Sequence, residues 1–467
     1  MTDPCPAIVV AGAGSGVGKT SITLGLTVAL TRRGMRVQTF KAGPDFLDPT
    51  YLSIASGRKS YNLDTWMCGA DYARKLFAEK THDADIALVE GAMGMYDGAS
   101  PSTSAGSSAE IAELLGAPVL LALSAKGAGR SLAAVVKGFV EFERGARIAG
   151  VAANFLGSEN HARILREALG SAGLPPLMAW VAKGAFPELA SRHLGLVSAD
   201  ARTLTSAIIA QLGDAIETHC DVDAILSAAS CSQPRITPRQ QANSGAQVRI
   251  GIARDDAFHF YYHDSLEALE RAGATLIAFS PIRDDALPDG LDGLYIGGGY
   301  PEVYAQELSR NTGMIRSVAD FAESGKPVYA ECGGLMYLSN GVETTDGARY
   351  PFTGALPVWT RMRRGFKSLG YATATLRNDT LLGAQGETIR GHMFHYSELA
   401  EDPLGCEGWS AAYTVQRNRG GEMAEGYSRG DILATYLHTS LGAHPRAVES
   451  FVERCRMTAH LKEVSNG

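Results

Sequence analysis

The sequence predicts two consecutive α/β domains, the first built around a parallel sheet. Two observations predict this architecture. Residues from 7 to about 225 alternate short apolar runs with amphipathic stretches, and an α/β pattern restarts at Val248. A chain of 467 residues also exceeds what a single hydrophobic core usually holds. We therefore expect an N-terminal domain over residues 1–229, a linker over 230–246 and a C-terminal domain over 247–467.

Apolar runs predict the strands of the first domain, and helical periodicity predicts the segments between them. The strands lie at Ile8–Ala11, Arg36–Phe40, Ile86–Glu90, Val119–Ser124 and Ile148–Asn154. Helical patterns include Ile22–Leu30, Ser131–Phe142 and Arg163–Gly170. Strands that alternate with helices in this way imply a parallel sheet covered on both faces.

The second domain begins after a polar, proline-containing stretch that has no hydrophobic period and is typical of a linker. Its strands are expected at Val248–Ala253, Leu276–Phe279, Gly293–Ile296 and Pro327–Ala330. The segment from about 355 to 437 is richer in strand patterns, and we expect part of it to be antiparallel.

Composition excludes several classes of protein. The formal charge is −7 without a basic block, so no nucleic-acid partner is expected. No apolar run reaches membrane-spanning length, and the first residues lack the pattern of a signal peptide. The seven cysteines are scattered and include no C-x-x-C pair. We therefore expect a cytoplasmic protein with reduced thiols, no membrane partner and no structural zinc.

A glycine-rich loop follows the first predicted strand. Its glycines, Gly14, Gly16 and Gly18, allow the backbone to wrap a phosphate group with its N–H groups pointing inward. Lys19 is placed to reach the β- and γ-phosphates, and Thr20 to bind Mg²⁺. This pattern predicts a site for ATP and Mg²⁺. It does not fit the dinucleotide fingerprint, whose third glycine would stand where this chain has Val17.

Charged side chains follow two other predicted strands of the first domain. Glu90 ends one strand, where a second Mg²⁺ ligand belongs. The other strand leads into a lysine, two carboxylates and two apolar residues, which we assign to the side of the site that holds the acceptor substrate: Lys41, Asp45, Phe46, Leu47 and Asp48. Asp97 is a further candidate on that side. The alternatives remain open: a solvated strand end for Glu90, and turn-forming residues for the three aspartates.

The first domain resembles the dethiobiotin synthetase group of P-loop enzymes through its glycine-rich loop and the Val89–Ala92 segment. A more specific likeness is carried by Lys41–Pro49, Asn62–Asp64 and Met67–Gly69. These segments resemble the cobyrinic acid a,c-diamide synthase family and its counterpart that acts on hydrogenobyrinic acid. The likeness covers nearly the whole chain.

In the second domain, Cys332 stands between a predicted strand and a predicted helix. A sharp turn there exposes the thiol at the helix start, which favours the thiolate. Gly333 can present its N–H to an oxyanion, and Gly298 and Gly299 of an earlier loop can supply the other donors. His438, at another strand end, is the candidate base. The alternatives are a buried structural thiol and a hydrogen-bonded core histidine.

These residues resemble class I (Triad) glutamine amidotransferase domains of the cobyrinic acid synthase type. The chain departs from that pattern at Ala330, where a glycine is usual, and at Ser440, where a carboxylate commonly follows the histidine. The third catalytic residue is therefore open, and the prediction is a Cys332–His438 dyad. Strand alternation predicts that Glu331 points away. We expect structural roles for His392 and His395.

The resemblance implies an ATP- and glutamine-dependent ligase of cobalamin biosynthesis. It would amidate the a and c acetate groups of cobyrinic or hydrogenobyrinic acid through an acyl phosphate, with ammonia from glutamine. One alternative is amidation of another tetrapyrrole, such as nickel-sirohydrochlorin. A second is a P-loop switch protein with a remnant amidotransferase domain, although Gly14 stands where partition ATPases have an extra lysine. Whether the corrin holds cobalt, whether the chain forms a homodimer and how ammonia travels are open.

Overall fold

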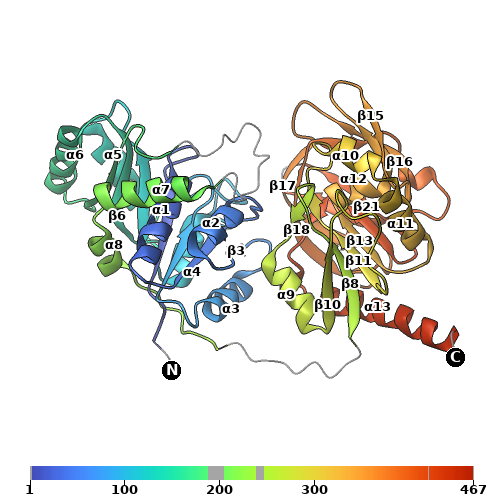
Figure 1. Ribbon diagram of the computed structural model, residues 1–467. Helices are drawn as coiled ribbons and strands as arrows, with labels where there is room; N and C mark the ends of the chain where they lie inside the picture. Colours follow the sequence, from blue (N-terminus) through green and yellow to red (C-terminus); the bar gives the residue numbers. More distant parts are fainter. Residues whose placement is uncertain (1–2, 188–203, 238–246, 419, 466–467) are drawn as a thin grey trace. The chain divides into compact units, whose positions relative to one another are not determined.

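The computed structural model describes residues 3–187, 204–237, 247–418 and 420–465. Contacts within the chain divide it into two compact units, residues 1–239 and 240–467. Each unit is a complete α/β fold with its own sheet (Figure 1). Among the described helices, none is both long and apolar enough to cross a membrane.

The described part of the first unit is built on seven parallel strands in the order β3-β2-β4-β1-β5-β6-β7. This confirms the predicted parallel sheet. The strands are β1 (Ala7–Gly12), β2 (Val37–Ala42), β3 (Tyr61–Leu63), β4 (Ile86–Glu90), β5 (Val119–Ser124), β6 (Ile148–Leu156) and β7 (Leu177–Ala182). The helices are α1 (Lys19–Arg32), α2 (Asp48–Ser56), α3 (Ala70–Lys80), α4 (Ser108–Leu115), α5 (Ser131–Phe142), α6 (Glu159–Ser171), α7 (Ser206–His219) and α8 (Val222–Ala228).

Both faces of this sheet are buried, as a parallel sheet requires. Along β1, Ile8 and Val10 pack into one hydrophobic cluster together with Ile216 of α7. Val9, on the alternate face, packs into another cluster with Leu165 of α6. Figure 1 shows α1 and α7 side by side on one face. Because every strand is parallel, their carboxyl ends meet at one edge, which brings together the loops after β1, β2 and β4.

The described part of the predicted linker is attached to the first unit. The backbone N–H groups of Ser230, Ser232 and Ile236 donate to carbonyls of that unit at 3.2, 2.9 and 3.1 Å. Residues 238–246, the remainder of the predicted linker, lie outside the described residues. The proposed boundaries at 229 and 247 therefore stay predictions.

Among its described residues, the second unit has a ten-stranded sheet in the order β10-β8-β11-β13-β22-β21-β20-β17-β18-β23, together with a four-stranded and a two-stranded sheet. Its strands are β8 (Val248–Ala253), β9 (Phe258–Phe260), β10 (Ala274–Phe279), β11 (Gly293–Ile296), β12 (Gly298–Gly299), β13 (Val328–Glu331), β14 (Ser339–Glu343), β15 (Arg349–Pro351), β16 (Leu356–Met362), β17 (Ser368–Leu376), β18 (Thr388–His395), β19 (Ser397–Leu399), β20 (Ser410–Arg417), β21 (Glu422–Arg429), β22 (Ile432–Thr435) and β23 (Leu437–His438). Its α-helices are α9 (His263–Arg271), α10 (Ala305–Arg310), α11 (Thr312–Glu323), α12 (Gly333–Leu338) and α13 (Pro445–Ser465), and its two 3₁₀ turns lie at Pro403–Gly405 and Leu441–Ala443.

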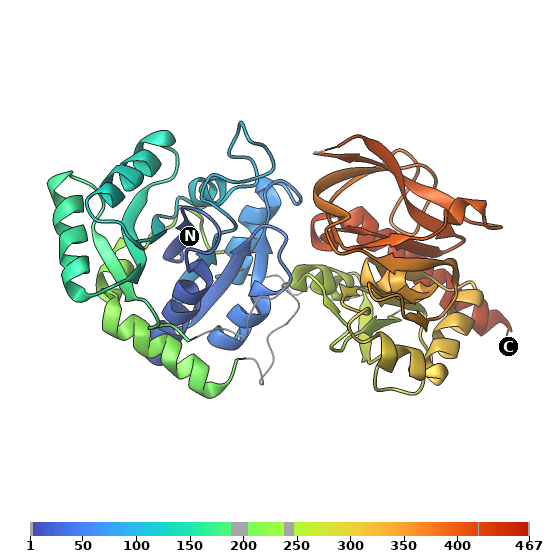
Figure 2. The same cartoon turned by 90° about the horizontal axis from the view of Figure 1, so that it is seen from above.

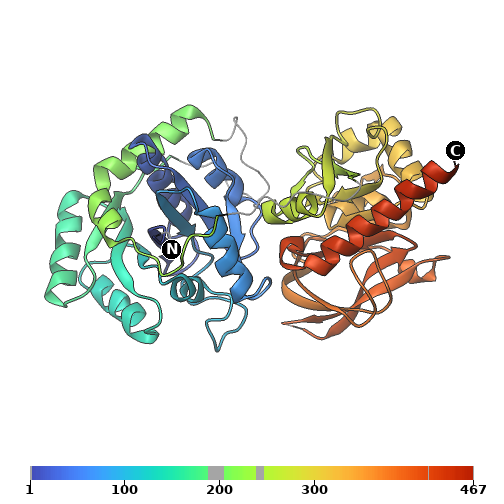
Figure 3. The ribbon, with the colours of Figure 1, turned by 90° about the horizontal axis from the view of Figure 1, so that it is seen from below.

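The large sheet changes character along its width. From β10 to β22 its strands are parallel, and from β22 to β23 they are antiparallel. This confirms the prediction of a partly antiparallel segment after residue 355. Within this unit, Figure 2 shows the later strands (orange to red) gathered on one side and the helices α10 and α11 (yellow) on the other. Figure 3 shows α13 (red) lying along the same unit.

Candidate functional site

The glycine-rich loop connects β1 to α1 and has the backbone that only glycine adopts easily. Gly16 and Gly18 have φ values of 76° and 95°, in the left-handed region. A Cβ atom on Gly18 would lie 2.1 Å from the side-chain amide of Asn154, so a larger residue at this one position would require Asn154 to move. The ammonium of Lys19 donates to the carbonyls of Gly14, at 2.9 Å, and Met93. These carbonyls hold the lysine across the loop.

A buried network of charges lies behind the loop. Thr20 donates its hydroxyl to Oε1 of Glu90 at 2.6 Å, and Nζ of Lys41 lies 3.1 Å from the same oxygen. Lys41 also pairs with Asp48 at 2.7 Å. Strands β2 and β4 set this pairing, because Lys41 and Glu90 are register partners. The structure therefore joins the predicted metal ligands and part of the predicted acceptor side into one cluster.

Burial and mutual repulsion change the protonation of this cluster. Burial raises the pKa of Glu90 to about 7, with Asp48 adding to the rise, while Lys41 and Thr20 oppose it. Burial also raises the pKa of Asp45 to about 6. Burial disfavours the ammonium of Lys41, but Asp48, Glu90 and Asp45 outweigh this effect and raise its pKa. The lysine therefore stays charged.

The cluster fits Mg²⁺. Oε2 of Glu90 is buried and accepts no hydrogen bond within the described structure, so this carboxylate oxygen is available as a hard ligand for a metal ion. Thr20 lies beside it. Among the described residues, no group of three or more His, Cys, Asp or Glu side chains could enclose a metal alone. A magnesium ion here would depend on Thr20, Glu90, water and nucleotide phosphates together.

The other residues predicted for the acceptor side lie at the start of α2 and beside the glycine-rich loop. Oδ1 of Asp45 accepts from the backbone N–H groups of Leu47, at 2.8 Å, and Asp48, at 3.0 Å, so Asp45 shapes this turn. Phe46 and Leu47 are half-buried. Asp97 is exposed and accepts from the N–H of Gly94 at 2.8 Å. In the structure, both aspartates therefore stabilise turns by accepting backbone hydrogen bonds, as the alternative interpretation of these residues predicts.

In the second unit, Cys332 forms a strained turn between β13 and α12. Its φ of 48° and ψ of −97° are outside the conformations that a residue with a Cβ prefers. Such strain persists where the surrounding structure holds a functional residue in place. The Cys332 N–H donates to the carbonyl of Thr435 at 2.7 Å, which anchors the turn to β22.

The three glycines predicted to bind an oxyanion lie around this turn. A Cβ on Gly333 would lie 3.0 Å from the backbone nitrogen of Gly299 and 3.4 Å from the carbonyl carbon of Gly298. A Cβ on Gly298 would lie 2.6 Å from Cε1 of His438. The structure thus brings together Cys332, His438 and the three predicted oxyanion glycines. A Cβ on Gly299 would lie 2.0 Å from the carbonyl oxygen of Ala257, so this glycine has no room for a side chain.

The prediction that Glu331 points away is wrong. Its Oε2 lies 3.6 Å from Nδ1 of His438, and both side chains are buried. Alternation holds only as far as the strand continues, and β13 ends at Glu331. The next residue, Cys332, leaves the strand with a positive φ, so its thiol and the carboxylate of Glu331 can both lie near His438. No motif in the sequence signals this contact.

The remaining polar residues around the thiol have structural contacts. Nδ1 of His395 lies 2.7 Å from the carbonyl of Ser397, and its ring stacks on Tyr436. His392 is the register partner of His438 across β18 and β23. Ser440, where a carboxylate is usual, donates to Oδ2 of Asp264 at 3.0 Å.

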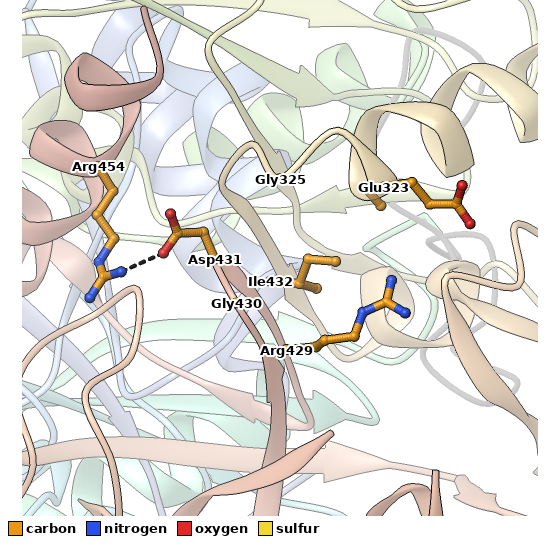
Figure 4. Close-up of a pocket in the computed structure, with 8 residues that line it drawn as sticks. Glu323, Gly325, Arg429, Gly430, Asp431, Ile432 and Arg454 are labelled. Atoms are coloured by element: carbon orange, nitrogen blue, oxygen red, sulfur yellow. Dashed lines mark hydrogen bonds and ion pairs between the residues drawn. The ribbon is translucent and has the colours of Figure 1, made fainter. Parts of the chain in front are cut away.

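A separate shallow hollow in the second unit is lined by Glu323, Arg429, Asp431 and Arg454, among others (Figure 4). Arg454 pairs with Asp431 there. None of the residues that line this hollow belongs to the site around Cys332. The hollow is therefore not part of the arrangement around Cys332.

Family models match both units. The CobQ/CobB/MinD/ParA nucleotide binding domain matches residues 8–183, and the CobB/CobQ-like glutamine amidotransferase domain matches residues 249–445. The chain is thus a P-loop nucleotide-binding domain followed by a class I glutamine amidotransferase domain, as the sequence predicts. It belongs to the cobyrinate a,c-diamide synthase family, and with its relatives it is a ligase that uses glutamine as nitrogen donor.

Three relatives illustrate the similarity. A cobyrinate a,c-diamide synthase of Syntrophotalea carbinolica is 53% identical, covering 97% of this chain and 99% of its own. One of Leptospira interrogans is 40% identical, covering 97% and 99%. A hydrogenobyrinate a,c-diamide synthase of Streptomyces coelicolor is 39% identical, covering 97% and 98%.

Proposed function

We propose that this chain amidates the a and c acetate carboxylates of a corrinoid, with ATP as energy source and glutamine as nitrogen donor. The observation that carries the proposal is the pairing, in one chain, of a strained cysteine beside a buried histidine with a glycine-rich phosphate loop. The relatives' names supply the substrate class, cobyrinate or hydrogenobyrinate.

The second unit is proposed to hydrolyse glutamine. The Cys332 thiolate attacks the side-chain amide carbon, and the N–H groups of Gly298, Gly299 and Gly333 stabilise the oxyanion. His438 gives its proton to the leaving ammonia. It then takes a proton from the water that attacks the thioester, which releases glutamate. This ammonia is the nitrogen source for the first unit.

The first unit is proposed to activate the acceptor carboxylate. Lys19 and the loop N–H groups hold the triphosphate, so that its terminal phosphoryl group can be transferred to the carboxylate. Thr20 and Glu90 would hold Mg²⁺, which would supply positive charge beside the phosphates. Ammonia then displaces phosphate and forms the amide. Exclusion of water protects the acyl phosphate from hydrolysis.

The acceptor side is proposed to consist of Lys41, Asp45, Asp48 and Asp97 with the apolar pair Phe46 and Leu47. The half-buried apolar pair suits contact with a flat macrocycle, and the lysine suits its carboxylates. The family resemblance implies that the c group reacts before the a group, so each product requires two successive reactions.

The test is Cys332→Ser, assayed with glutamine and separately with ammonium at high pH. We expect glutamine-driven amidation to disappear and ammonium-driven amidation to persist, because only glutamine hydrolysis needs the thiol. Efficient glutamine use by Cys332→Ser would contradict the assignment.

The choice of macrocycle is tested by comparing cobyrinic and hydrogenobyrinic acid as substrates of the wild-type chain. We expect formation of an a,c-diamide from at least one of them, with ATP consumed. Exclusive activity on another tetrapyrrole, such as nickel-sirohydrochlorin, would replace the proposed substrate but keep the reaction. ATP turnover that no carboxylated tetrapyrrole stimulates would contradict the reaction itself.

A further inference from the structure

We propose that Glu331 is a positioning residue, which orients His438 and stabilises its imidazolium form during glutamine hydrolysis. The observation is the position of Oε2, 3.6 Å from Nδ1 of His438, with both side chains buried. Hydrogen bonds of catalytic groups are often long without substrate and shorten in the reacting complex. The inference rests on the proposed glutaminase activity of the second unit.

The carboxylate of Glu331 is held in place from three directions. Tyr329 donates its hydroxyl to Oε1, and the backbone N–H of Thr439 donates to the same oxygen at 3.3 Å. Tyr295 donates its hydroxyl to Oε2 at 3.2 Å. Burial, with Glu331 adding to it, raises the pKa of both tyrosines well above the usual range, so both remain donors. A carboxylate restrained in this way can fix the ring orientation of a neighbouring histidine.

The charges that face His438 support this role. Burial disfavours its imidazolium, but Cys332 and Glu331 outweigh burial and raise its pKa to about 10. His392 and His395 also face it. Burial lowers their pKa values to about 3 and about 4, so both are neutral near neutral pH.

Two other buried carboxylates near the site accept hydrogen bonds from groups other than His438. Glu425 accepts from the hydroxyl of Thr435 at 2.7 Å and from the N–H of Tyr436 at 2.6 Å. Asp264 accepts from the hydroxyl of Ser440 at 3.0 Å. Neither contact involves the imidazole. Glu425, as deeply buried as Glu331, therefore offers a matched control.

The role follows from the path of the protons. Nδ1 of His438 faces Glu331, so Nε2 is the nitrogen left to take the proton of the Cys332 thiol. That proton passes to the departing ammonia, and the attacking water later gives a proton back to Nε2. At the two stages when Nε2 holds this proton, the ring is an imidazolium, and the negative charge of Glu331 lies beside it. Glu331 itself is not protonated in the cycle.

The experiment compares Glu331→Gln, Glu331→Asp and the control Glu425→Gln in the full-length chain. Glutaminase kcat and KM are measured, together with amidation driven by ammonium. Mass spectrometry of the Cys332 peptide follows its alkylation by iodoacetamide as a function of pH. Thermal unfolding checks that each variant folds.

For Glu331→Gln we expect glutaminase kcat to fall on the order of 10²-fold, as for loss of acid–base catalysis, with KM little changed. Amidation driven by ammonium should persist. Alkylation of Cys332 should begin at a pH higher by about one unit, because an unsupported imidazolium stabilises the thiolate less. Glu331→Asp, which keeps the charge, should restore part of both effects. Glu425→Gln removes a carboxylate whose charge also interacts with His438 but whose hydrogen bonds go to other groups, so it should shift the profile less than Glu331→Gln does.

An unchanged alkylation profile in Glu331→Gln would overturn the inference, as would an equal shift in Glu425→Gln. If Glu331→Gln does not fold, Tyr295→Phe replaces it, because it removes the donor to Oε2 and keeps the ring. It should then lower kcat without changing KM, and an unaltered kcat would count against the proposal. If Cys332→Ser still hydrolyses glutamine, the proposed function fails. If Cys332→Ser loses glutamine hydrolysis but Glu331→Gln behaves as the wild type, the proposed function stands and only the role of Glu331 fails.

Discussion

The two sites of this molecule differ in the charged groups that they contain and in the kind of ligand that these groups suit. In the first unit, Lys41, Asp48 and Glu90 are buried together, while the adjacent loop offers open backbone around Gly14 and Gly16. In the second unit, a strained cysteine lies among glycines and next to a histidine that a carboxylate faces. The first arrangement suits a highly charged ligand and its metal. The second suits a neutral amide, on which charge develops only during reaction.

The largest expected effect is the loss of amidation in Lys19→Ala, which distinguishes the phosphate site of the first unit from the thiol site of the second. Lys19→Ala removes a cation from the triphosphate, and loss of this contact should slow amidation on the order of 10²-fold or more. Both nitrogen sources should be affected equally, while glutamine hydrolysis alone should largely survive. Rates of ATP, glutamine and amide turnover measure this. A full rate of ammonium-driven amidation in Lys19→Ala would show that Lys19 does not stabilise the transferred phosphoryl group.

A second change tests how the first unit tolerates its buried charges. Lys41→Met leaves Asp48 and Glu90 buried without a cation, which typically destabilises a protein by about 3–5 kcal/mol. The loss should be smaller at pH 5 than at pH 8, because the carboxylates can then be neutral. Urea unfolding at both pH values measures it. The control is Lys75→Met, an exposed helical lysine whose loss should cost under about 0.5 kcal/mol.

A third change asks whether the start of α2 orients the acceptor. Asp45→Asn keeps an oxygen that can accept from Leu47 and Asp48, so the turn should form while the charge is lost. If Asp45 orients the corrinoid, the two amidations should slow unequally and a monoamide should accumulate. Mass spectrometry of the products over time measures this, with Asp48→Asn beside it. Equal slowing of both steps would assign these residues to the nucleotide or the fold.

The smallest expected effect concerns pH. Because the pKa of Glu90 is raised to about 7 in the folded state, its contribution to stability is present below its unfolded value of 4.5 and is lost as pH rises through 7. The first unit should therefore lose on the order of 1–3 kcal/mol across that range without Mg²⁺. Glu90→Gln should flatten the dependence and also raise the magnesium needed for amidation. An identical slope in both proteins would show that the titration of Glu90 does not cause the pH dependence.

Sequence patterns predicted the elements better than the contacts between them. The apolar runs at Ile86–Glu90 and Val119–Ser124 match β4 and β5, because a strand buried on both faces must be apolar throughout. The contact between Lys41 and Glu90 depends on β2 lying beside β4, two strands that are not consecutive in the chain. A single sequence does not reveal that pairing.

Around Cys332, too, the sequence predicted the local turn but not all of its tertiary contacts, and here the reason is the end of a strand. The glycines around Cys332 predicted a tight turn, and the structure has one. The direction of Glu331 was predicted wrongly, because period-two alternation ends where the backbone leaves the strand. The partner of a side chain at such a point is set by tertiary contacts, here with Tyr295 and Tyr329.

The positive φ of Cys332 has a consequence for how this protein can evolve. A non-glycine residue held there costs on the order of 1–3 kcal/mol, so the proposed nucleophile lowers the stability of its own domain. Glycine would relieve that strain and abolish the thiol in one substitution. Where free ammonia is plentiful and glutamine use is no longer selected, drift towards a more stable domain and loss of the glutaminase proceed in the same direction.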